Sequence, residues 1–258
     1  MTAALRVALG EYDTGWHSPE ASLAGAEALV RTAAGCGARV VVLPEMATSG
    51  FTMDPSQAVG LDAAPVRRLR DIAQRHGTWL IAGVAVAETT AAAGTCVVNA
   101  ALAIDPAGEI AAVHRKQRLF AFAGEHEVYT AGTSPTTVTI DGVRVALLIC
   151  YELRFAEVFA AVADRVDCMV LIANWPAARR PHWDALLRAR AIENQCALIG
   201  VNRTGTGGGL AYDGGSAAYD AWGDVLPPAP GCPVPVVTVD PRAVAEVREK
   251  YPFLKDRA

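Results

Sequence analysis

The chain contains 258 residues, of which 27 are acidic and 23 are Lys or Arg, giving a formal net charge of -4. This balance leaves no broad basic field for phosphates or for an anionic membrane surface, so we expect neither nucleic acid nor a membrane as a partner. A composition that is 52% hydrophobic and 19% charged is too apolar for a disordered chain. The length suits a single α/β domain spanning residues 1–258.

The first half of the chain predicts alternating strands and helices. Short apolar runs flank two segments of helical periodicity, which stop at Gly37 and Gly77. The turn at 105–108 contains Pro and Gly and suits a tight reversal between antiparallel strands, so the predicted sheet is mixed. The predicted strands span 5–10, 39–43, 79–86, 96–104 and 110–115, and the predicted helices span 19–36 and 64–76.

The second half predicts strands that are covered on both faces. Residues 144–150 and 168–173 are short apolar runs, as expected for buried parallel strands. Two such halves fit a four-layer α-β-β-α sandwich of two mixed sheets, although the periodicity alone fits a Rossmann-like sheet equally well. Further predicted strands span 196–201, 216–222 and 236–240, and further predicted helices span 155–165 and 181–195.

The cysteines and the first residues bear on the cellular compartment. The chain has six cysteines without a C-x-x-C pair, so neither a zinc knuckle nor a thioredoxin-type motif is available. Arg6 and Glu11 interrupt the segment that would have to be the apolar part of a signal peptide, and no run is long enough to span a bilayer. We therefore expect a cytoplasmic protein whose six cysteines are free thiols.

Three residues with catalytic potential stand where predicted strands end: Glu45, Lys116 and Cys150. The carboxyl ends of strands are where α/β folds gather active-site groups. Amide hydrolysis needs a nucleophile, a base for its proton, and a cation or donor for the oxyanion, and these three side chains supply those roles. We expect the Lys116 ammonium to favour the Cys150 thiolate. This chemistry needs neither a metal nor another cofactor.

Competing motifs are incomplete. The glycines at 205–209 are not followed by Gly-Lys-Ser/Thr, and they do not complete a G-x-G-x-x-G fingerprint. The five histidines show no metal-ligand spacing, and neither Ser49 nor Ser216 lies in a G-x-S-x-G segment. We therefore interpret 205–209 as a flexible loop and expect no metal or serine mechanism.

Three segments resemble the signature motifs of the nitrilase, or carbon-nitrogen hydrolase, superfamily. They are Leu-Pro-Glu at 43–45, Arg-Lys at 115–116 and Ile-Cys-Tyr-Glu-Leu-Arg-Phe at 149–155, in the order and at the separations typical of that family. The resemblance spans nearly the whole chain. It implies two mixed sheets packed face to face with helices outside, and commonly a homodimer.

The resemblance also implies roles for individual residues. Glu45 corresponds to the general base, Cys150 to the nucleophile, and Lys116 to the oxyanion stabiliser, assisted by the backbone N–H of Tyr151. The implied reaction passes through a cysteine thioester and releases ammonia and a carboxylate. Its substrate is a small carboxamide.

Further positions match the family less uniformly. Glu125 resembles the second glutamate that many members place beside the Lys and Cys, with Glu127 as the alternative. Trp175 corresponds to a residue that lines the substrate pocket. Glu152 stands where many relatives have Asp, and we expect Arg154 to form a structural ion pair rather than to bind substrate.

Distinctive segments at 12–16, 48–55 and 173–176 resemble the omega-amidase branch, whose members remove ammonia from 2-oxoglutaramate or 2-oxosuccinamate. Such substrates need a cationic site for the remote carboxylate, and the candidates are Arg179, Arg180 and Arg203. Around 205–209 the chain has glycines where relatives often have Asp-Gly-Asn, and this loop is expected to border the pocket.

Several other functions remain open on the same residues. The first alternatives are a broad aliphatic amidase and an N-carbamoyl amine amidohydrolase, followed by nitrile hydrolysis. A non-catalytic interaction protein with the nitrilase fold is the alternative outside enzymes. Retention of Glu45, Lys116 and Cys150 together argues against that last reading.

Overall fold

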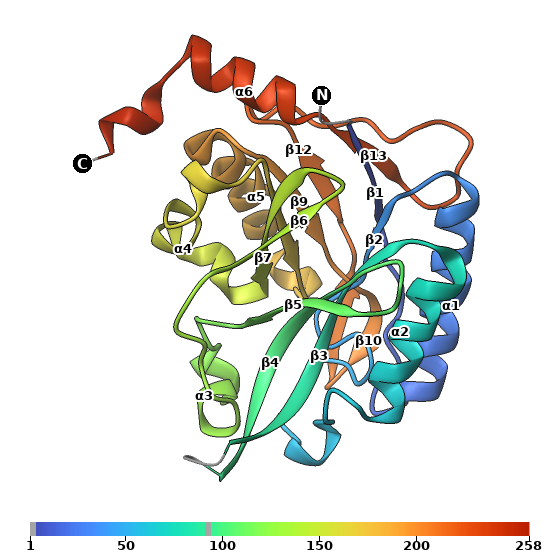
Figure 1. Ribbon diagram of the computed structural model, residues 1–258. Coiled ribbons are helices and arrows are strands. Elements are labelled where there is room, and N and C mark those ends of the chain that lie inside the picture. The colour runs from blue at the N-terminus through green and yellow to red at the C-terminus, as the bar shows by residue number, and fades with distance from the viewer. Residues whose placement is uncertain (1–3, 91–93, 258) are drawn as a thin grey trace.

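A computed structural model describes residues 4–90 and 94–257 of the chain. Two large sheets lie face to face, with helices on both outer sides and a small two-stranded ribbon at one end (Figure 1). The predicted four-layer α-β-β-α sandwich of two mixed sheets is therefore confirmed. The Rossmann-like alternative is wrong, because the strands form two sheets rather than one.

The first sheet has six strands in the order β13-β1-β2-β3-β4-β5. β1, β2 and β3 run parallel, and the other neighbours pair antiparallel. The predicted reversal after β4 is present, because β4 and β5 form an antiparallel pair. The bounds are β1 Leu5–Leu9, β2 Val40–Val42, β3 Trp79–Thr90, β4 Gly94–Ile104, β5 Ile110–Arg115 and β13 Val236–Val239.

The second sheet has five strands in the order β12-β9-β8-β7-β6. β7, β8 and β9 are parallel, while the two edge strands pair antiparallel with their neighbours. β10 and β11 form the separate ribbon. The bounds are β6 Thr136–Ile140, β7 Val143–Ile149, β8 Cys168–Ile172, β9 Ala197–Val201, β10 Thr204–Gly207, β11 Leu210–Asp213 and β12 Ala217–Tyr219.

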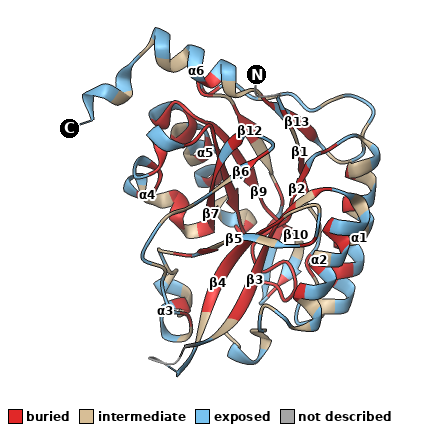
Figure 2. Ribbon diagram, in the orientation of Figure 1, coloured by how far each residue is buried: buried red, intermediate tan, exposed pale blue. Residues whose placement is uncertain are grey.

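Alternation along the strands of the first sheet separates two cores. Val40 and Val42 join the core that the two sheets share, whereas Val41 between them joins the core under the outer helices. Successive side chains of a strand point to opposite faces, so a strand with helices on one face and a sheet on the other must be apolar throughout. The strands of both sheets are accordingly buried over most of their length (Figure 2).

The helices cover the outer faces of the sandwich. α1 and α2 pack against each other beside the first sheet, and α4 and α5 lie beside the second (Figure 1). α2 ends at Gly77, whose φ of 62° gives the left-handed cap that the sequence predicted as a stop. The bounds are α1 Pro19–Gly35, α2 Ala64–His76, α3 Glu125–Val128, α4 Ala156–Ala160, α5 Arg180–Asn194 and α6 Pro241–Lys250.

The predicted helix over 155–165 is wrong in its extent. A 3-10 turn at Cys150–Arg154 precedes this segment, which itself forms only the short helix α4 and a second 3-10 turn at Ala163–Arg165. Val162, with φ -121° and ψ -10°, breaks the helical geometry between the last two. α3, β6, α6 and the β10–β11 ribbon were not predicted. Among the described residues, no helix is long and apolar enough to cross a membrane.

The prediction of six free thiols is also wrong. Cys36, at the end of α1, forms a disulfide with Cys232, and their Cα atoms are 5.9 Å apart. The partners are separated by 196 residues in sequence, and the pairing of β13 with β1 brings the loop that contains Cys232 back to α1. Cys96, Cys150, Cys168 and Cys196 are free.

Candidate active site

The three predicted strand-end residues converge at the interface between the two sheets. Glu45 follows β2 and Lys116 follows β5, so both come from the first sheet. Cys150 follows β7 and therefore comes from the second sheet, as does Asn174, which follows β8. The site is thus assembled across the sandwich rather than along one sheet.

Lys116 lies between two carboxylates in a fully buried cluster. Its Nζ atom is 2.8 Å from Oε1 of Glu45 and 2.9 Å from each carboxylate oxygen of Glu125. All three side chains are 0% exposed. Glu127, the alternative to Glu125, is exposed and makes no contact with Lys116 among the described residues. Two carboxylates and one ammonium give the cluster a net charge of -1 when all are ionised.

Two asparagines that the motif comparison left without a role orient these carboxylates. Asn99 Nδ2 donates to Glu45 Oε1 at 2.8 Å and to Glu125 Oε1 at 2.7 Å. The backbone N–H of Asn174 donates to Glu45 Oε2 at 2.9 Å, and its Nδ2 donates to the Glu45 carbonyl at 2.6 Å. The available signal for Asn99 was a polar residue inside an apolar strand, which is costly to bury unless it has partners.

A close backbone approach fixes the segment that carries Glu45. The Ala47 N–H donates to the carbonyl of Gly83 in β3 at 2.8 Å. A Cβ at position 83 would stand 2.4 Å from Met46 N and 2.5 Å from Glu45 Cα, so this approach requires glycine. β3 therefore acts as a template for the position of Glu45.

Cys150 occupies a strained turn at the start of the 3-10 segment. Its φ of 44° lies in the left-handed region, which is uncommon for a residue other than glycine. Its Sγ atom is 3.8 Å from the Asn174 carbonyl, and 9% of the residue is exposed. Strain of this kind is costly and is found where the surrounding structure holds a functional residue in place.

Burial and charge control the protonation of the site. Burial, and after it the negative charge of Glu45, raise the pKa of the Cys150 thiol, and Lys116 offsets them only in part. Burial by itself lowers the pKa of Lys116, but the charges of Glu125 and Glu45 outweigh it and hold that pKa above its usual value. The charge of Lys116 does favour the thiolate, as predicted, but burial and the charge of Glu45 outweigh it, and the pKa of Cys150 lies above its usual value.

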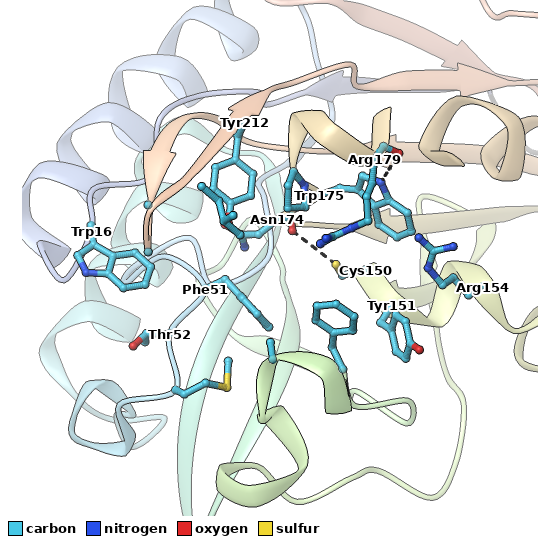
Figure 3. A pocket seen from close by; sticks show the side chains of 17 residues that line it. Trp16, Phe51, Thr52, Cys150, Tyr151, Arg154, Asn174, Trp175, Arg179 and Tyr212 are labelled. Atoms are coloured by element: carbon cyan, nitrogen blue, oxygen red, sulfur yellow. Dashed lines mark hydrogen bonds between the residues drawn. The ribbon is translucent and has the colours of Figure 1, made fainter. Parts of the chain in front are cut away.

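A cavity of about 250 Å³ leads to Cys150 (Figure 3). No Asp or Glu side chain lines it within the described part of the chain. Gly207 and Gly208 of the ribbon line it too, so the predicted border role of the glycine loop is confirmed. Its aromatic wall consists of Trp16, Phe51, Phe120, Tyr151, Trp175 and Tyr212.

Tyr151 and Trp175, the two predicted substrate-binding residues, both line this cavity. The Tyr151 ring lies 4.8 Å from the ring of Phe120, centroid to centroid. Trp175 is 3% exposed, and its Nε1 donates to the carbonyl of Arg179 at 2.9 Å. The two residues thus reach the same cavity from the turn after β7 and the loop after β8.

Two arginines line the cavity without a carboxylate partner in the described chain. The Arg154 guanidinium lies 4.8 Å from the Trp175 ring centroid, and that of Arg179 lies 5.3 Å from the Phe120 centroid. Both line the cavity that leads to Cys150 (Figure 3), and a terminal nitrogen of Arg154 also lies 3.2 Å from Nδ1 of His182. The prediction of a structural ion pair for Arg154 is therefore wrong.

The other two candidate arginines have internal partners. Arg180 pairs with Asp184 at 2.7 Å and does not line the cavity. Arg203 is fully buried, pairs with Asp13 at 2.5 Å and lies under the ring of Tyr212 at 4.7 Å. Arg179 is thus the one of the three sequence candidates that reaches the cavity. Within the described residues, no group of three or more His, Cys, Asp or Glu could hold a metal ion.

The two-sheet sandwich and the Glu, Lys and Cys at its centre define a class of hydrolase. The profile of the carbon-nitrogen hydrolase family matches residues 6–249, and the chain belongs to that family. The solved structure of XC1258 from Xanthomonas campestris is 33% identical, with a TM-score of 0.89 over 99% of this chain and 98% of that one. It is described as a CN-hydrolase superfamily protein with an arsenic adduct in its active site.

Curated relatives include named amidases. The chain is 36% identical to omega-amidase YafV of Escherichia coli (strain K12) over 223 residues, which are 85% of this chain and 84% of that protein. It is 32% identical to 2-oxoglutaramate amidase of Bacillus subtilis (strain 168) over 252 residues, 95% of each chain. The resemblance predicted from the motifs is therefore confirmed.

Proposed function

We propose that the protein is an omega-amidase, which hydrolyses the terminal carboxamide of 2-oxoglutaramate or a related dicarboxylate monoamide. The relatives at 32–36% identity, an omega-amidase and a 2-oxoglutaramate amidase, support an amidase. The observation that carries the choice of substrate is a pocket with Cys150 at its floor, Arg154 and Arg179 on its wall and no lining acid among the described residues. Such a pocket suits a small amide with an anionic end.

Acylation begins with proton transfer from Cys150 to Glu45. The thiolate sulfur then attacks the amide carbon, and the carbonyl electrons move to oxygen. The Lys116 ammonium donates to Glu45 and to both carboxylate oxygens of Glu125, and one of these N–H donors turns to the oxyanion, which the backbone N–H of Tyr151 also stabilises. Collapse breaks the C–N bond as Glu45 returns the proton to nitrogen, so ammonia leaves and a Cys150 thioester remains.

Deacylation repeats these roles with water. Glu45 removes a proton from water, whose oxygen attacks the thioester carbon. The second tetrahedral intermediate expels the Cys150 thiolate, which recovers the proton, and the product is a carboxylic acid that ionises. Because Asn99 and Asn174 hold both oxygens of Glu45, the same carboxylate is oriented for both half-reactions.

Ammonia release from a panel of amides tests the proposal. The panel contains 2-oxoglutaramate, succinamate, uncharged aliphatic amides and N-carbamoyl amines, each with a Cys150→Ala control. We expect preference for the carboxylate-bearing monoamides and no turnover in the control. Preference for uncharged amides or carbamoyl compounds would replace the substrate while keeping the mechanism, and turnover by Cys150→Ala would defeat the nucleophile assignment. Inactivity on every amide would favour the interaction-protein alternative.

We also propose that residues 1–258 act as one domain that assembles as a homodimer. An exposed aromatic cluster supports the dimer: Trp222 is 48% exposed and Phe253 57% exposed, and both rings neighbour Tyr251. Ile192 of α5, also 48% exposed, lies against Gly223, the neighbour of Trp222, and extends this apolar surface. Light scattering on the purified protein tests the assembly, and a monomeric mass at micromolar concentration would contradict it.

Cytoplasmic localisation stays a prediction, and one observation weighs against it. Disulfides are rare in reducing compartments, yet Cys36 and Cys232 form one. Fractionation of cells tests the compartment. Thiol labelling of the protein recovered in each fraction shows whether Cys36 and Cys232 are bridged there. A protein found outside the cytoplasm would overturn the prediction.

A further inference from the structure

Glu152 is a fully buried carboxylate that lies beside the site but has no role in the reaction steps above. Its Oε1 accepts the backbone N–H of Gln117 at 2.6 Å, and its Oε2 accepts that of Ile149 at 2.6 Å. His114 Nε2 is a third contact, 3.1 Å from Oε2. Three donors around one carboxylate satisfy a charge that is otherwise expensive to bury.

The two backbone donors are the immediate neighbours of two catalytic groups. Gln117 follows Lys116, at the end of β5 in the first sheet, and Ile149 precedes Cys150, at the end of β7 in the second. A single side chain therefore joins the two sheets at the point where each presents its reacting residue. Its hydrogen bonds act on the main chain, which moves the attached side chains as a unit.

The distance between Lys116 on the first sheet and Cys150 on the second matters for the chemistry. The sulfur of Cys150 and the ammonium of Lys116 must address the same carbonyl group, one at carbon and the other at oxygen. A misplacement of about 1 Å can lower an enzyme's rate by about 10²-fold. On the first sheet, Glu45 and Glu125 hold Lys116, but they do not hold the turn that carries Cys150.

We propose that Glu152 is a positioning residue, which sets the separation between Lys116 and Cys150 by bonding the main chain next to both. The inference rests on the proposed amidase function, because the separation matters for a carbonyl held between the two groups. His114 is part of the device. It donates from Nε2 to the carboxylate, and its Nδ1 has no partner among the described residues, so the ring is held by Glu152.

Glu152→Gln, which keeps the shape and removes the charge, tests the proposal. Its amide has one acceptor oxygen, so one of the two backbone N–H groups loses its partner. We expect kcat per titrated active site to fall by about 10- to 100-fold, with KM changing by less than about threefold. Glu152→Asp keeps the charge on a shorter side chain, and we expect it to recover part of the lost kcat.

Asp167→Asn is the matched control for a merely structural effect. Asp167 is 8% exposed and accepts the backbone N–H of Arg144 at 3.0 Å, at the opposite end of β7 from Cys150. We expect this variant to lower the melting temperature while kcat per titrated site stays within about twofold of the wild type. A Glu152→Gln enzyme that keeps its kcat, or loses no more than Asp167→Asn, would overturn the proposal.

A readout that does not depend on substrate separates this proposal from the proposed function. The rate of iodoacetamide alkylation depends on the fraction of Cys150 that is thiolate, and the charge of Lys116 increases that fraction. If Glu152→Gln moves Lys116 away from Cys150, the pH profile of alkylation should shift to higher pH. Glu152→Asp gives the same readout should the Gln variant fail to fold. An unchanged profile in a folded variant contradicts the positioning role, whichever amides the enzyme hydrolyses.

Discussion

The floor and the wall of the pocket are built in different ways. The floor is Cys150 together with the cluster of Glu45, Lys116 and Glu125 beside it; these three side chains do not line the cavity, are fully buried and are held by short hydrogen bonds from both sheets. On the wall, aromatic rings and two arginines come from turns, loops and the β10–β11 ribbon, and neither arginine has a carboxylate partner among the described residues. The floor is organised to hold one geometry for a reaction, whereas the wall keeps positive charges without a carboxylate partner for a ligand.

This difference predicts how variants divide. Changes on the floor should lower kcat for every amide, because the same groups act on every carbonyl. Changes on the wall should alter the preference among amides and leave the chemistry in place. Four variants test that division, and their expected loss of turnover decreases from Glu45→Gln to Cys36→Ser.

Glu45→Gln should lower turnover by about 10²- to 10⁴-fold, because the proposed general base is lost. The same variant should alkylate faster than the wild type at neutral pH. The charge of Glu45 raises the pKa of Cys150, so removing it while Lys116 remains lowers that pKa and increases the thiolate fraction. Parallel assays of ammonia release and iodoacetamide labelling check the expected decrease in turnover and the expected increase in alkylation rate. A variant that both turns over and alkylates more slowly would contradict this electrostatic account.

Gly83→Ala should reduce kcat for all amides and destabilise the fold by about 1–3 kcal/mol, as overpacking does. The new Cβ would stand 2.4 Å from Met46 N and displace the segment that carries Glu45. Gly60→Ala is the control, because its Cβ meets no atom within 4 Å. Kinetics and thermal melts of both variants give the comparison. Equal behaviour of the two would show that β3 does not template Glu45.

Arg179→Ala should lower kcat/KM for carboxylate-bearing amides by roughly 10- to 150-fold, the equivalent of one charged hydrogen bond of about 1.5–3 kcal/mol. Turnover of an uncharged amide should be nearly unchanged. The neighbouring Arg180, paired with Asp184 and outside the cavity, provides the control variant Arg180→Ala. A uniform loss across charged and uncharged amides would place Arg179 with the floor rather than the wall.

Cys36→Ser should leave kcat and substrate preference unchanged, since the disulfide lies at the end of α1 and its residues do not line the active-site cavity. Loss of the bridge should cost about 2–4 kcal/mol of stability under oxidising conditions. Melting curves of the variant and of the wild type, with and without reductant, measure this cost. If reductant does not change the melting temperature of the wild type, the bridge contributes nothing to stability.

The catalytic floor was partly visible in the sequence, since Glu45, Lys116 and Cys150 each follow an apolar run of strand character. Strand ends of an α/β fold lie close together, so position along the chain carried information about position in space. The glutamate beside Lys116 needed the family resemblance to be chosen from two candidates. Asn99 had a weaker signal, because burial alone does not say which groups a polar side chain meets.

Local pattern determined the mixed strands, the main helices and the strand-end placement of Glu45, Lys116 and Cys150, because alternation and helical periodicity act over a few residues. The packing of the layers determined the pairing of Cys36 with Cys232, the placement of Arg154 in the cavity wall and the link that Glu152 makes between the sheets. Each of these depends on which surfaces pack together. Contacts between residues far apart in sequence are set by the packing of whole layers, which no local window of residues contains.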